Sequence, residues 1–317
     1  MKIPDHLLSS GNPKVSFEIL PPTKGSSIRE IFDTLDPLME FNPPYINITY
    51  HQPELVLKKR ENGLLEQKVV RKRPGTVAIS SAIKNKYMVD VVPHLICGGF
   101  TREDTEDALI DLHYLGIHNI LIVRGDADPF TGKFAPVPEG NEHAIDLLRQ
   151  VIDMNDGRYL DDELENPTPT TFSVGVAGYP EKHSEAPNLD TDLRHLKAKV
   201  DAGAEYVVTQ MFFDNRKYFE FVQKCRDLGI TVPIIPGLKP VSIKKHLNLL
   251  PQTFKVDLPN ELASEMERCN DNKSVRELGI EWAIHQSREL LAAGVPIIHF
   301  FTMGRADNIR RIAENLF

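Results

Sequence analysis

The chain has 317 residues, of which 41% are hydrophobic and 26% charged, a composition typical of a globular protein. Its 37 Lys and Arg against 45 Asp and Glu give a net charge of −8, which disfavours a nucleic-acid or anionic-membrane surface. Cys97, Cys225 and Cys269 are widely spaced without a CxxC motif, which favours a reducing compartment over a disulfide framework or a zinc ribbon. Because we find no signal-peptide core and no run of about 18 apolar residues, we expect a cytoplasmic protein.

Short apolar runs rich in β-branched and aromatic residues recur along the chain, separated by longer amphipathic stretches. The strand candidates are Val15–Leu20, Tyr45–Tyr50, Val91–Ile96, Asn119–Val123, Phe172–Ala177, Tyr206–Phe212, Val232–Pro236 and Ile297–Phe301. The helix candidates include Ser27–Phe41, Glu103–Leu115, Glu142–Ile152, Asp190–Ala202, Lys217–Leu228 and Val275–Ala293. This alternation predicts a parallel sheet, and eight strands without an evident linker favour a closed α/β barrel, the (β/α)8 or TIM barrel, over an open doubly wound sheet.

We therefore expect a single barrel domain over residues 1–317, with two departures from the eightfold pattern. Residues 153–171 are acidic and contain two prolines, which predicts an exposed insertion before the fifth strand. Residues 251–271 follow the seventh strand, and we expect an extra helix there from Asn260 to Arg268.

The functional groups of such a barrel lie at the carboxyl ends of its strands. Nearly every expected strand ends with polar or ionisable side chains, whereas a purely structural rim would have mostly Ser, Asn and Gly. In strand order these side chains are Glu18, Thr49 and Tyr50, His94, Arg124 and Asp126, Tyr179 and His183, Thr209 and Gln210, and Thr302 and Arg305. The pattern predicts a functional site on this rim.

Glu18 stands between Phe17 and Ile19 in a strand, so a barrel-facing carboxylate would be partly desolvated. Burial raises the pKa of a carboxyl group, which would make Glu18 a candidate general acid. The structural alternative is an ion pair with an inner Arg or Lys. His94 alone is a weak signal, the histidines lack metal-ligand spacing, and the sequence has neither a Rossmann glycine motif nor a P-loop, so we expect no catalytic metal.

Taken together, the motifs resemble the methylenetetrahydrofolate reductase family in order and spacing, from about Val15 to Phe317. Each motif is weak alone, but YPEKH followed by KVDAGAEYVVTQMFFD is specific as a set. The others are FEILPP, NITY, PHLIC, ILIVRGD, IIPGLKPV and FFTMGRAD. The length resembles that of the bacterial catalytic barrel alone, without the regulatory domain of eukaryotic members.

The resemblance implies a flavoprotein oxidoreductase of one-carbon metabolism and methionine biosynthesis. FAD would lie across the carboxyl end of the barrel, where NADH or NADPH reduces it and leaves. 5,10-Methylenetetrahydrofolate then takes its place and receives the hydride, giving 5-methyltetrahydrofolate by a ping-pong mechanism. The cofactor supplies the redox chemistry, and the protein supplies orientation and proton handling. We expect a homo-oligomer with no nucleic-acid or membrane partner.

Carried over position by position, the resemblance implies that Glu18 is the catalytic acid that protonates the folate and opens its five-membered ring to an iminium. It implies that Asp126 is also catalytic, lying beside the flavin pyrimidine and contacting the folate. Gln210 matches a pterin-contacting position, and Arg305 a contact with the folate or its glutamate tail. The positions implied to contact FAD are Thr49, His94, Arg124, Gly125, Asp126, Tyr179, His183, Ala186, Asp192 and Lys199.

The chain also departs from the family pattern. Ile19 and Leu20 replace the aromatic residues that often follow the catalytic glutamate, which is a mild packing change. HQPE follows NITY in place of a Gly-rich run, which alters the loop expected to shape nicotinamide access. The segment 153–171 is longer than in compact bacterial members, so the subunit interface does not follow from the resemblance.

Two other classes of protein stay open on the sequence. One is a non-flavin barrel lyase or aldolase that forms a Schiff base, for which Lys239 in PGLKP is the candidate near a strand end. The other is a non-catalytic ligand-binding barrel, against which the presence of both Glu18 and Asp126 argues. A flavin spectrum of the purified protein would separate the first class from a flavoenzyme.

Overall fold

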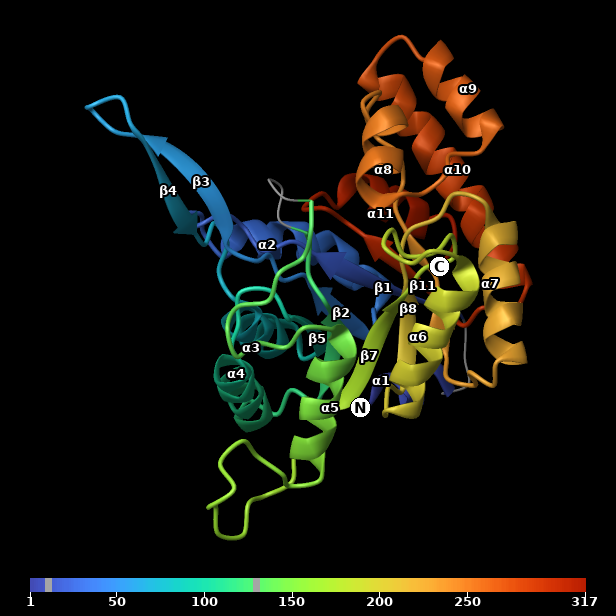
Figure 1. Ribbon diagram of the computed structural model, residues 1–317. Helices are drawn as coiled ribbons and strands as arrows, with labels where there is room; N and C mark the ends of the chain where they lie inside the picture. The colour runs from blue at the N-terminus through green and yellow to red at the C-terminus, as the bar shows by residue number, and fades with distance from the viewer. Residues whose placement is uncertain (9–12, 128–131) are drawn as a thin grey trace.

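The computed structural model in Figure 1 describes residues 1–8, 13–127 and 132–317. The barrel strands are β1 Lys14–Ile19, β2 Tyr45–Ile48, β5 Asp90–Ile96, β6 Asn119–Val123, β7 Ser173–Gly178, β8 Tyr206–Thr209, β9 Ile234–Ile235, β10 Gly237–Leu238 and β11 Ile297–Phe301. They are parallel and follow the order β10-β11-β1-β2-β5-β6-β7-β8-β9. The predicted (β/α)8 barrel is confirmed.

The seventh position of the barrel is filled by two short strands, β9 and β10, on either side of Pro236. β9 pairs with β8 and β10 pairs with β11, so together they join the two ends of the sheet. Pro236 has no N–H to donate, but its carbonyl accepts a hydrogen bond from His299 N at 3.0 Å. The predicted bounds of this strand, 232–236, are therefore wrong, since pairing begins at Ile234 and continues to Leu238.

Helices cover the outside of the barrel (Figure 1). Their bounds are α2 Arg29–Leu35, α3 Thr76–Tyr87, α4 Arg102–Tyr114, α5 Ala144–Asn155, α6 Leu189–Asp201, α7 Asn215–Asp227, α10 Asn272–Ala292 and α11 Asp307–Ala313. The predicted helix over 27–41 becomes a 3₁₀ helix from Asp36 to Phe41, where Pro37 cannot donate the next α-helical hydrogen bond. The sequence did not indicate α3, because two of its buried residues, Thr76 and Ser80, are polar and blur the apolar period.

The predicted extra helix is confirmed with its predicted bounds as α9, Asn260–Arg268. It stands beyond the carboxyl end of the barrel beside α8, His246–Phe254, which was not predicted (Figure 1). The two helices and the first turn of α10 enclose a separate apolar cluster. Its buried members are Met211, Phe213, Val241, Leu250, Val256, Leu262, Met266 and Val275.

An antiparallel hairpin of β3 Glu54–Lys59 and β4 Leu65–Val70 projects from the barrel after β2 (Figure 1). It was not predicted from the sequence, because the segment carries charges and apolar residues without strict alternation. Its turn closes through a hydrogen bond from Arg60 N to Leu64 O at 2.8 Å, with Gly63 at φ 80°. The hairpin therefore occupies the place where a nicotinamide-access loop was expected.

The lower barrel interior is apolar and tightly packed, and α1, Ile3–Leu8, closes its amino end. Ile3 is fully buried, and its N–H donates to Asn119 Oδ1 at 3.0 Å. Tyr206 fills the space opposite Gly175, where an added Cβ would lie 2.2 Å from the tyrosine ring. The other buried members of this layer are Tyr45, Val92, Leu121, Val208, Ile235 and Ile297. These side chains form an apolar cluster separate from the one between the strands and the outer helices.

Residues 156–171 form a loop at the amino end of the barrel, at the bottom of Figure 1. The first part of the predicted insertion, Asp153–Asn155, belongs to α5 instead. Asp161, Asp162, Glu163 and Glu165 are exposed on the loop, as expected for an acidic segment outside the core. Across the described ranges, none of the helices has both the length and the apolar character that a membrane span requires.

Candidate functional site

Glu18 lies near the carboxyl end of β1, where alternation directs Ser16 and Glu18 into the barrel and Phe17 and Ile19 outward into the helical layer. The Glu18 side chain is 12% exposed. Thr302, which follows β11, donates hydrogen bonds from N and Oγ1 to the Glu18 carbonyl at 3.1 and 2.7 Å. The backbone of the candidate acid is therefore fixed between two strands.

Three side chains from neighbouring strands surround the Glu18 carboxylate. Thr49 Oγ1 donates a hydrogen bond to Oε1 at 2.7 Å. The Nε2 atoms of His94 and His299 each lie 3.5 Å from Oε2, at the outer limit of hydrogen bonding. The groups that face the Glu18 carboxylate are thus two imidazoles and a hydroxyl, rather than the Lys or Arg of the structural alternative.

These imidazoles reverse the expected effect of burial on Glu18. Burial raises the pKa of the carboxyl group, but the positive charge of His94, the contact with His299 and the Thr49 hydrogen bond together lower it below its ordinary value. The expectation of a raised pKa is therefore wrong for this arrangement. Burial also lowers the pKa of His94, against the opposing charge of Glu18. When His94 loses its proton, its charge no longer lowers the pKa of Glu18.

Three further residues, which were not predicted from the sequence, belong to this polar layer: His299, Ser16 and Asn47. His299 Nδ1 is 2.8 Å from Ser16 Oγ, and Asn47 Nδ2 is 3.2 Å from His94 Nε2. Asn47 Oδ1 is buried without a hydrogen-bond partner in the described part of the chain. The sequence contained a signal for two of them, because side chains two residues apart in a strand point to the same face. Ser16 therefore shares a face with Glu18, and His299 shares one with Phe301, which pairs with Glu18 in the sheet.

A pocket of about 340 Å³ lies between the ends of β6 and β7, the first turn of α5 and the helix α6. Six of the positions predicted to contact FAD line it: Arg124, Tyr179, His183, Ala186, Asp192 and Lys199. Thr49 and His94 lie instead against Glu18. Of the positions predicted to contact FAD, six thus line one pocket and two lie against Glu18.

Arg124 and Lys199 give the pocket its positive charge. Arg124 Nη1 and Nη2 each donate to Glu185 at 2.6 Å, and this pairing raises the pKa of the guanidinium. Its Nε is buried without a hydrogen-bond partner among the described residues. Burial lowers the pKa of the Lys199 amine to about 8, with the charge of Asp192 opposing, while Nζ donates to Ala177 O at 3.2 Å. The two cations suit a phosphate or another anion.

The loop after β7 wraps this pocket. Asp192 Oδ2 accepts the His183 N–H at 2.8 Å, and the His183 ring packs edge-on against Tyr179 with centroids 4.8 Å apart. Burial, aided by the charge of Asp192, raises the pKa of Tyr179 to about 12, so its hydroxyl remains a donor. Asp192 therefore holds the backbone of the loop that lines the pocket.

Asp126 is exposed at the end of β6, next to this pocket. Its carbonyl accepts a hydrogen bond from Gln52 Nε2 at 3.0 Å. Gly125 has φ 100°, and an added Cβ would lie 3.2 Å from Gln52 Oε1, whereas one on Gly98 would lie 2.2 Å from the same atom. Gln52, from the segment that departs from the family pattern, therefore packs against the backbone at both Gly98 and Gly125.

Gln210 and Arg305 follow β8 and β11, two other strands of the barrel. Gln210 N donates to Gly178 O at 2.8 Å, and its Oε1 accepts from Met211 N at 2.9 Å, which fixes the side-chain amide. Arg305 is exposed after β11 and lines a second pocket with Lys239, the residue considered for a Schiff base. Neither residue lines the pocket of Arg124 and Lys199.

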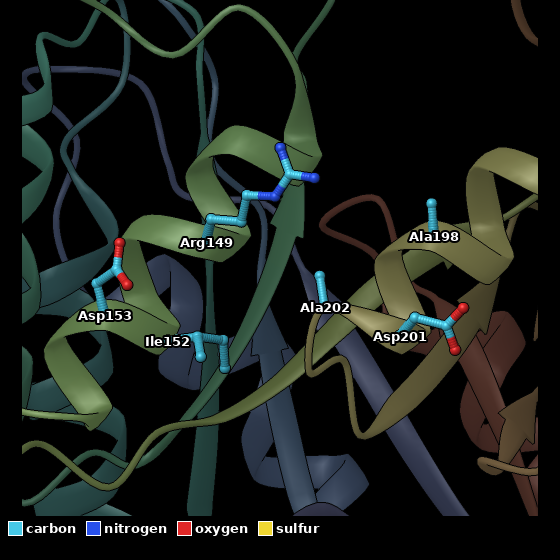
Figure 2. Close-up of a pocket in the computed structure, with 6 residues that line it drawn as sticks. All are labelled: Arg149, Ile152, Asp153, Ala198, Asp201 and Ala202. Atoms are coloured by element: carbon cyan, nitrogen blue, oxygen red, sulfur yellow. The ribbon is translucent and has the colours of Figure 1, made fainter.

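A shallow groove of about 450 Å³ continues outward from Ala198 between α5 and α6. Figure 2 shows Ile152 and Ala202 facing one another across it, with the carboxylates of Asp153 and Asp201 on opposite sides. Because its polar groups do not converge, we assign no site to it. Within the residues that the structure describes, no cluster of three or more His, Cys, Asp or Glu could hold a metal ion.

The fold and the site together define a class of protein. It is a (β/α)8 barrel with a buried ionisable cluster and two ligand-sized pockets at the carboxyl ends of its strands, as in barrel enzymes. The family model described as methylenetetrahydrofolate reductase matches residues 2–317. The chain belongs to the methylenetetrahydrofolate reductase family.

Named relatives agree with this placement. Methylenetetrahydrofolate reductase (NADH) 1 of Arabidopsis thaliana is 30% identical over 329 residues, covering 100% of this chain and 51% of the relative. 5,10-Methylenetetrahydrofolate reductase of Escherichia coli (strain K12) is 31% identical over 307 residues, covering 96% and 91%. The chain thus spans about half the length of the plant relative and most of the bacterial one.

A solved structure supports the fold independently. It is an uncharacterised protein from Clostridium thermocellum that binds two copies of 5-methyl-5,6,7,8-tetrahydrofolic acid. The TM-score is 0.60 at 13% sequence identity, and the match covers 98% of this chain and 96% of that one. At this identity the similarity shows a shared barrel architecture and no more.

Proposed function

We propose that this chain reduces 5,10-methylenetetrahydrofolate to 5-methyltetrahydrofolate with NAD(P)H, using FAD in a ping-pong reaction. One observation carries the proposal: in a chain of this family, a buried carboxylate and a pocket that contains the cations Arg124 and Lys199 lie at the carboxyl ends of strands of the same barrel. This arrangement provides a proton source on the same rim as a site for a large anionic cofactor. It favours a flavoenzyme over the Schiff-base lyase and the non-catalytic barrel.

The residues present fit FAD on the chemistry of their donors. Arg124 and Lys199 are cations for its diphosphate or flavin carbonyls, and the unpartnered Arg124 Nε is a further donor. The positive φ of Gly125 allows the backbone a close approach to a flat ring. When bound, FAD supplies the redox chemistry by accepting hydride from the nicotinamide and donating hydride to the one-carbon unit.

We assign proton delivery to Glu18. Thr49 holds Oε1, and Oε2 faces the Nε2 atoms of His94 and His299, each at 3.5 Å. A neutral His94 and a bound ligand that excludes water would both raise the pKa of Glu18 toward the protonated form that the folate step needs. The charge of Glu18 would thereby depend both on the charge of His94 and on whether a ligand occupies the site.

The other predicted residues would orient the substrate. Asp126 at the end of β6 and Gln210 at the end of β8 stand two strands apart on the rim, where carboxylate and amide can pair with the pterin edge. Arg305, exposed beyond β11, suits the folate tail carboxylates.

We further propose that the chain acts as one catalytic domain, that it assembles as a homo-oligomer, and that it works in the cytoplasm. The last point is supported by its three cysteines, which are free thiols.

A spectrum of the purified protein tests the proposal. Flavin absorbance should bleach anaerobically with NADH or NADPH and return when 5,10-methylenetetrahydrofolate is added, with 5-methyltetrahydrofolate detected by mass spectrometry. Comparing the two nicotinamides at equal concentration identifies the reductant. A protein without flavin, or one whose bleached flavin the folate does not reoxidise, would contradict the proposal.

A further inference from the structure

The hairpin of β3 and β4 projects from the barrel and is strongly basic (Figure 1). Residues 54–73 hold seven Lys and Arg against three Glu, in a chain whose net charge is −8. Lys58, Lys59 and Lys68 are exposed on it. The hairpin is therefore a concentrated positive surface on a protein that is otherwise acidic.

One face of the hairpin is also apolar. Residues that pair across two strands, and residues two apart in one strand, share a face, so Leu57, Lys59, Leu65 and Val69 lie together. Leu57 is 47% exposed, Leu65 63% and Val69 67%. Because a two-stranded hairpin is only marginally stable by itself, a partner that covers this face would stabilise it.

A surface of opposite character lies on the loop of residues 156–171. Asp161, Asp162, Glu163 and Glu165 are exposed there, and Leu164 stands among them with 47% of its surface exposed. The loop thus combines negative charge with an exposed apolar side chain, as the hairpin combines positive charge with exposed apolar side chains. The two surfaces are complementary in charge and alike in having apolar area to bury.

The loop is held in one shape by hydrogen bonds to its backbone. The Tyr159 hydroxyl donates to Thr168 O at 2.7 Å and closes the loop on itself. The Leu160 N–H donates to Oε2 of Glu106 in α4 at 2.9 Å, which ties the loop to the barrel. A surface that is already formed loses little conformational freedom when a partner binds.

The hairpin and the loop of one chain lie far apart. The hairpin follows β2 at the carboxyl end of the barrel, and the loop precedes β7 at the amino end (Figure 1). Two hairpins would repel one another, and the net charge of −8 opposes approach to a nucleic acid or an anionic membrane. A second copy of the chain, by contrast, offers the acidic loop as a matching surface.

We propose that the apolar, basic face of the hairpin docks on the acidic loop of a second copy of this chain. The contact joins two different surfaces, so it arranges copies head to tail, in a closed ring or an open chain. Residues 54–73 and 156–171 are at or below the roughly 20–30 residues a side of a stable interface, so the contact should be weak and sensitive to salt. The inference specifies the homo-oligomer proposed above and does not depend on the catalytic proposal.

Sedimentation velocity over a range of protein concentrations, at low and high ionic strength, tests the contact with three charge-reversal variants. The hairpin variant combines Lys58→Glu, Lys59→Glu and Lys68→Glu. The loop variant combines Asp162→Lys, Glu163→Lys and Glu165→Lys. The matched control reverses three exposed lysines outside both segments, Lys224→Glu, Lys245→Glu and Lys273→Glu. Thermal melting checks that each variant folds, and because the first two probe the same contact from its two sides, either one suffices.

We expect the unchanged protein to associate more at higher concentration and less at high salt. The hairpin variant and the loop variant should each raise the dissociation constant by about tenfold or more, because like charges then meet, whereas the control should not. A mixture of these two variants should associate again, because every hairpin then finds a loop of opposite charge.

Three results would overturn the inference. Association that both variants retain would show that copies meet through other surfaces, and would leave the proposed homo-oligomer standing. A monomeric unchanged protein would overturn both. A monomeric protein that binds vesicles of anionic lipid through the hairpin, with binding lost in the hairpin variant, would assign this face to a membrane surface instead.

Discussion

The charge of Glu18 depends in part on the charge of the His94 imidazole. Burial pushes the carboxyl toward its protonated form, while His94, His299 and Thr49 pull it toward the anion, and the pull of His94 lasts only while the imidazole is charged. A lysine or arginine in the same place would have fixed Glu18 as an anion. Imidazole partners are therefore compatible with an acid that must be reprotonated in each cycle.

Gln210→Ala tests how substrate recognition is divided from cofactor retention. The amide is held by Met211 N and lies outside the pocket of Arg124 and Lys199. We expect folate binding to weaken by roughly 1–3 kcal/mol, the usual cost of leaving a polar partner unpaired, with the flavin content unchanged. Folate titration and flavin absorbance measure the two effects. Loss of flavin with unchanged folate affinity would place Gln210 with the cofactor instead.

At the scale of the elements, β7 and β8 fit together inside the barrel because Gly175 has no side chain and leaves room for Tyr206. Tyr206 is fully buried, and its hydroxyl donates to Ile120 O at 2.9 Å, which fixes the ring against Gly175. A methyl group at Gly175 would overlap that ring. The apolar layer beneath Glu18 therefore depends on this pair.

Gly175→Ala should lower the thermal melting midpoint, because overpacking a buried site costs about 1–3 kcal/mol. Gly75→Ala is the control, since nothing lies within 4 Å of an added Cβ there. Tyr206→Leu makes room for the methyl group, so it should destabilise less in the Gly175→Ala background than alone. Additive effects of the two substitutions would show that the ring does not confront Gly175.

Glu181, in the YPEKH motif, links the end of β7 to the segment between α8 and α9. Its side chain is 8% exposed, Oε2 accepts the Asp257 N–H at 2.9 Å, and Lys217 Nζ lies 3.8 Å away. Burial raises the pKa of Glu181 to about 7, and the charge of Asp257 contributes. The folded protein therefore holds a proton here that the unfolded chain releases at lower pH.

The sign of the pH effect follows from that difference. Between about pH 4 and pH 7 the folded state binds more protons at Glu181 than the unfolded state, so the Glu181 contribution to stability falls as the pH rises. Glu181→Gln keeps an acceptor but cannot ionise. Its free energy of unfolding, relative to the unchanged protein, should rise by roughly 1–3 kcal/mol from pH 5 to pH 7.5. Glu220→Gln, on an exposed side chain, should show no such trend. A pH-independent difference for Glu181→Gln would refute the buried-acid interpretation.

For the whole molecule, the elements that follow from local periodicity could be predicted from the sequence, whereas those that depend on tertiary contacts could not. β6 and β11 were predicted with their final bounds, because β-branched and apolar runs in a parallel sheet leave little ambiguity. The split at Pro236 depends on which neighbour each half pairs with, and the hairpin β3–β4 depends on a turn rather than on a buried face.

The candidate site was predictable to a similar extent. The rim rule and the family motifs named Glu18, Arg124 and Lys199, and the structure places them around one mouth. The lowered pKa of Glu18 was not predictable, because it arises from His94 and from His299, 76 and 281 residues away in the sequence. Residues that far apart are brought together only when the barrel closes.

The central claim is that Glu18 supplies the proton for the folate step and has no part in oxidation of the nicotinamide. Glu18→Gln separates the two, with Glu220→Gln as a matched control, in anaerobic stopped-flow measurements of each half-reaction. We predict that flavin reduction by the nicotinamide remains close to that of the unchanged protein, while reoxidation by 5,10-methylenetetrahydrofolate slows by about 10²–10⁴-fold, the range for loss of a general acid. Equal slowing of both half-reactions, or unimpaired reoxidation by the folate, would contradict the account.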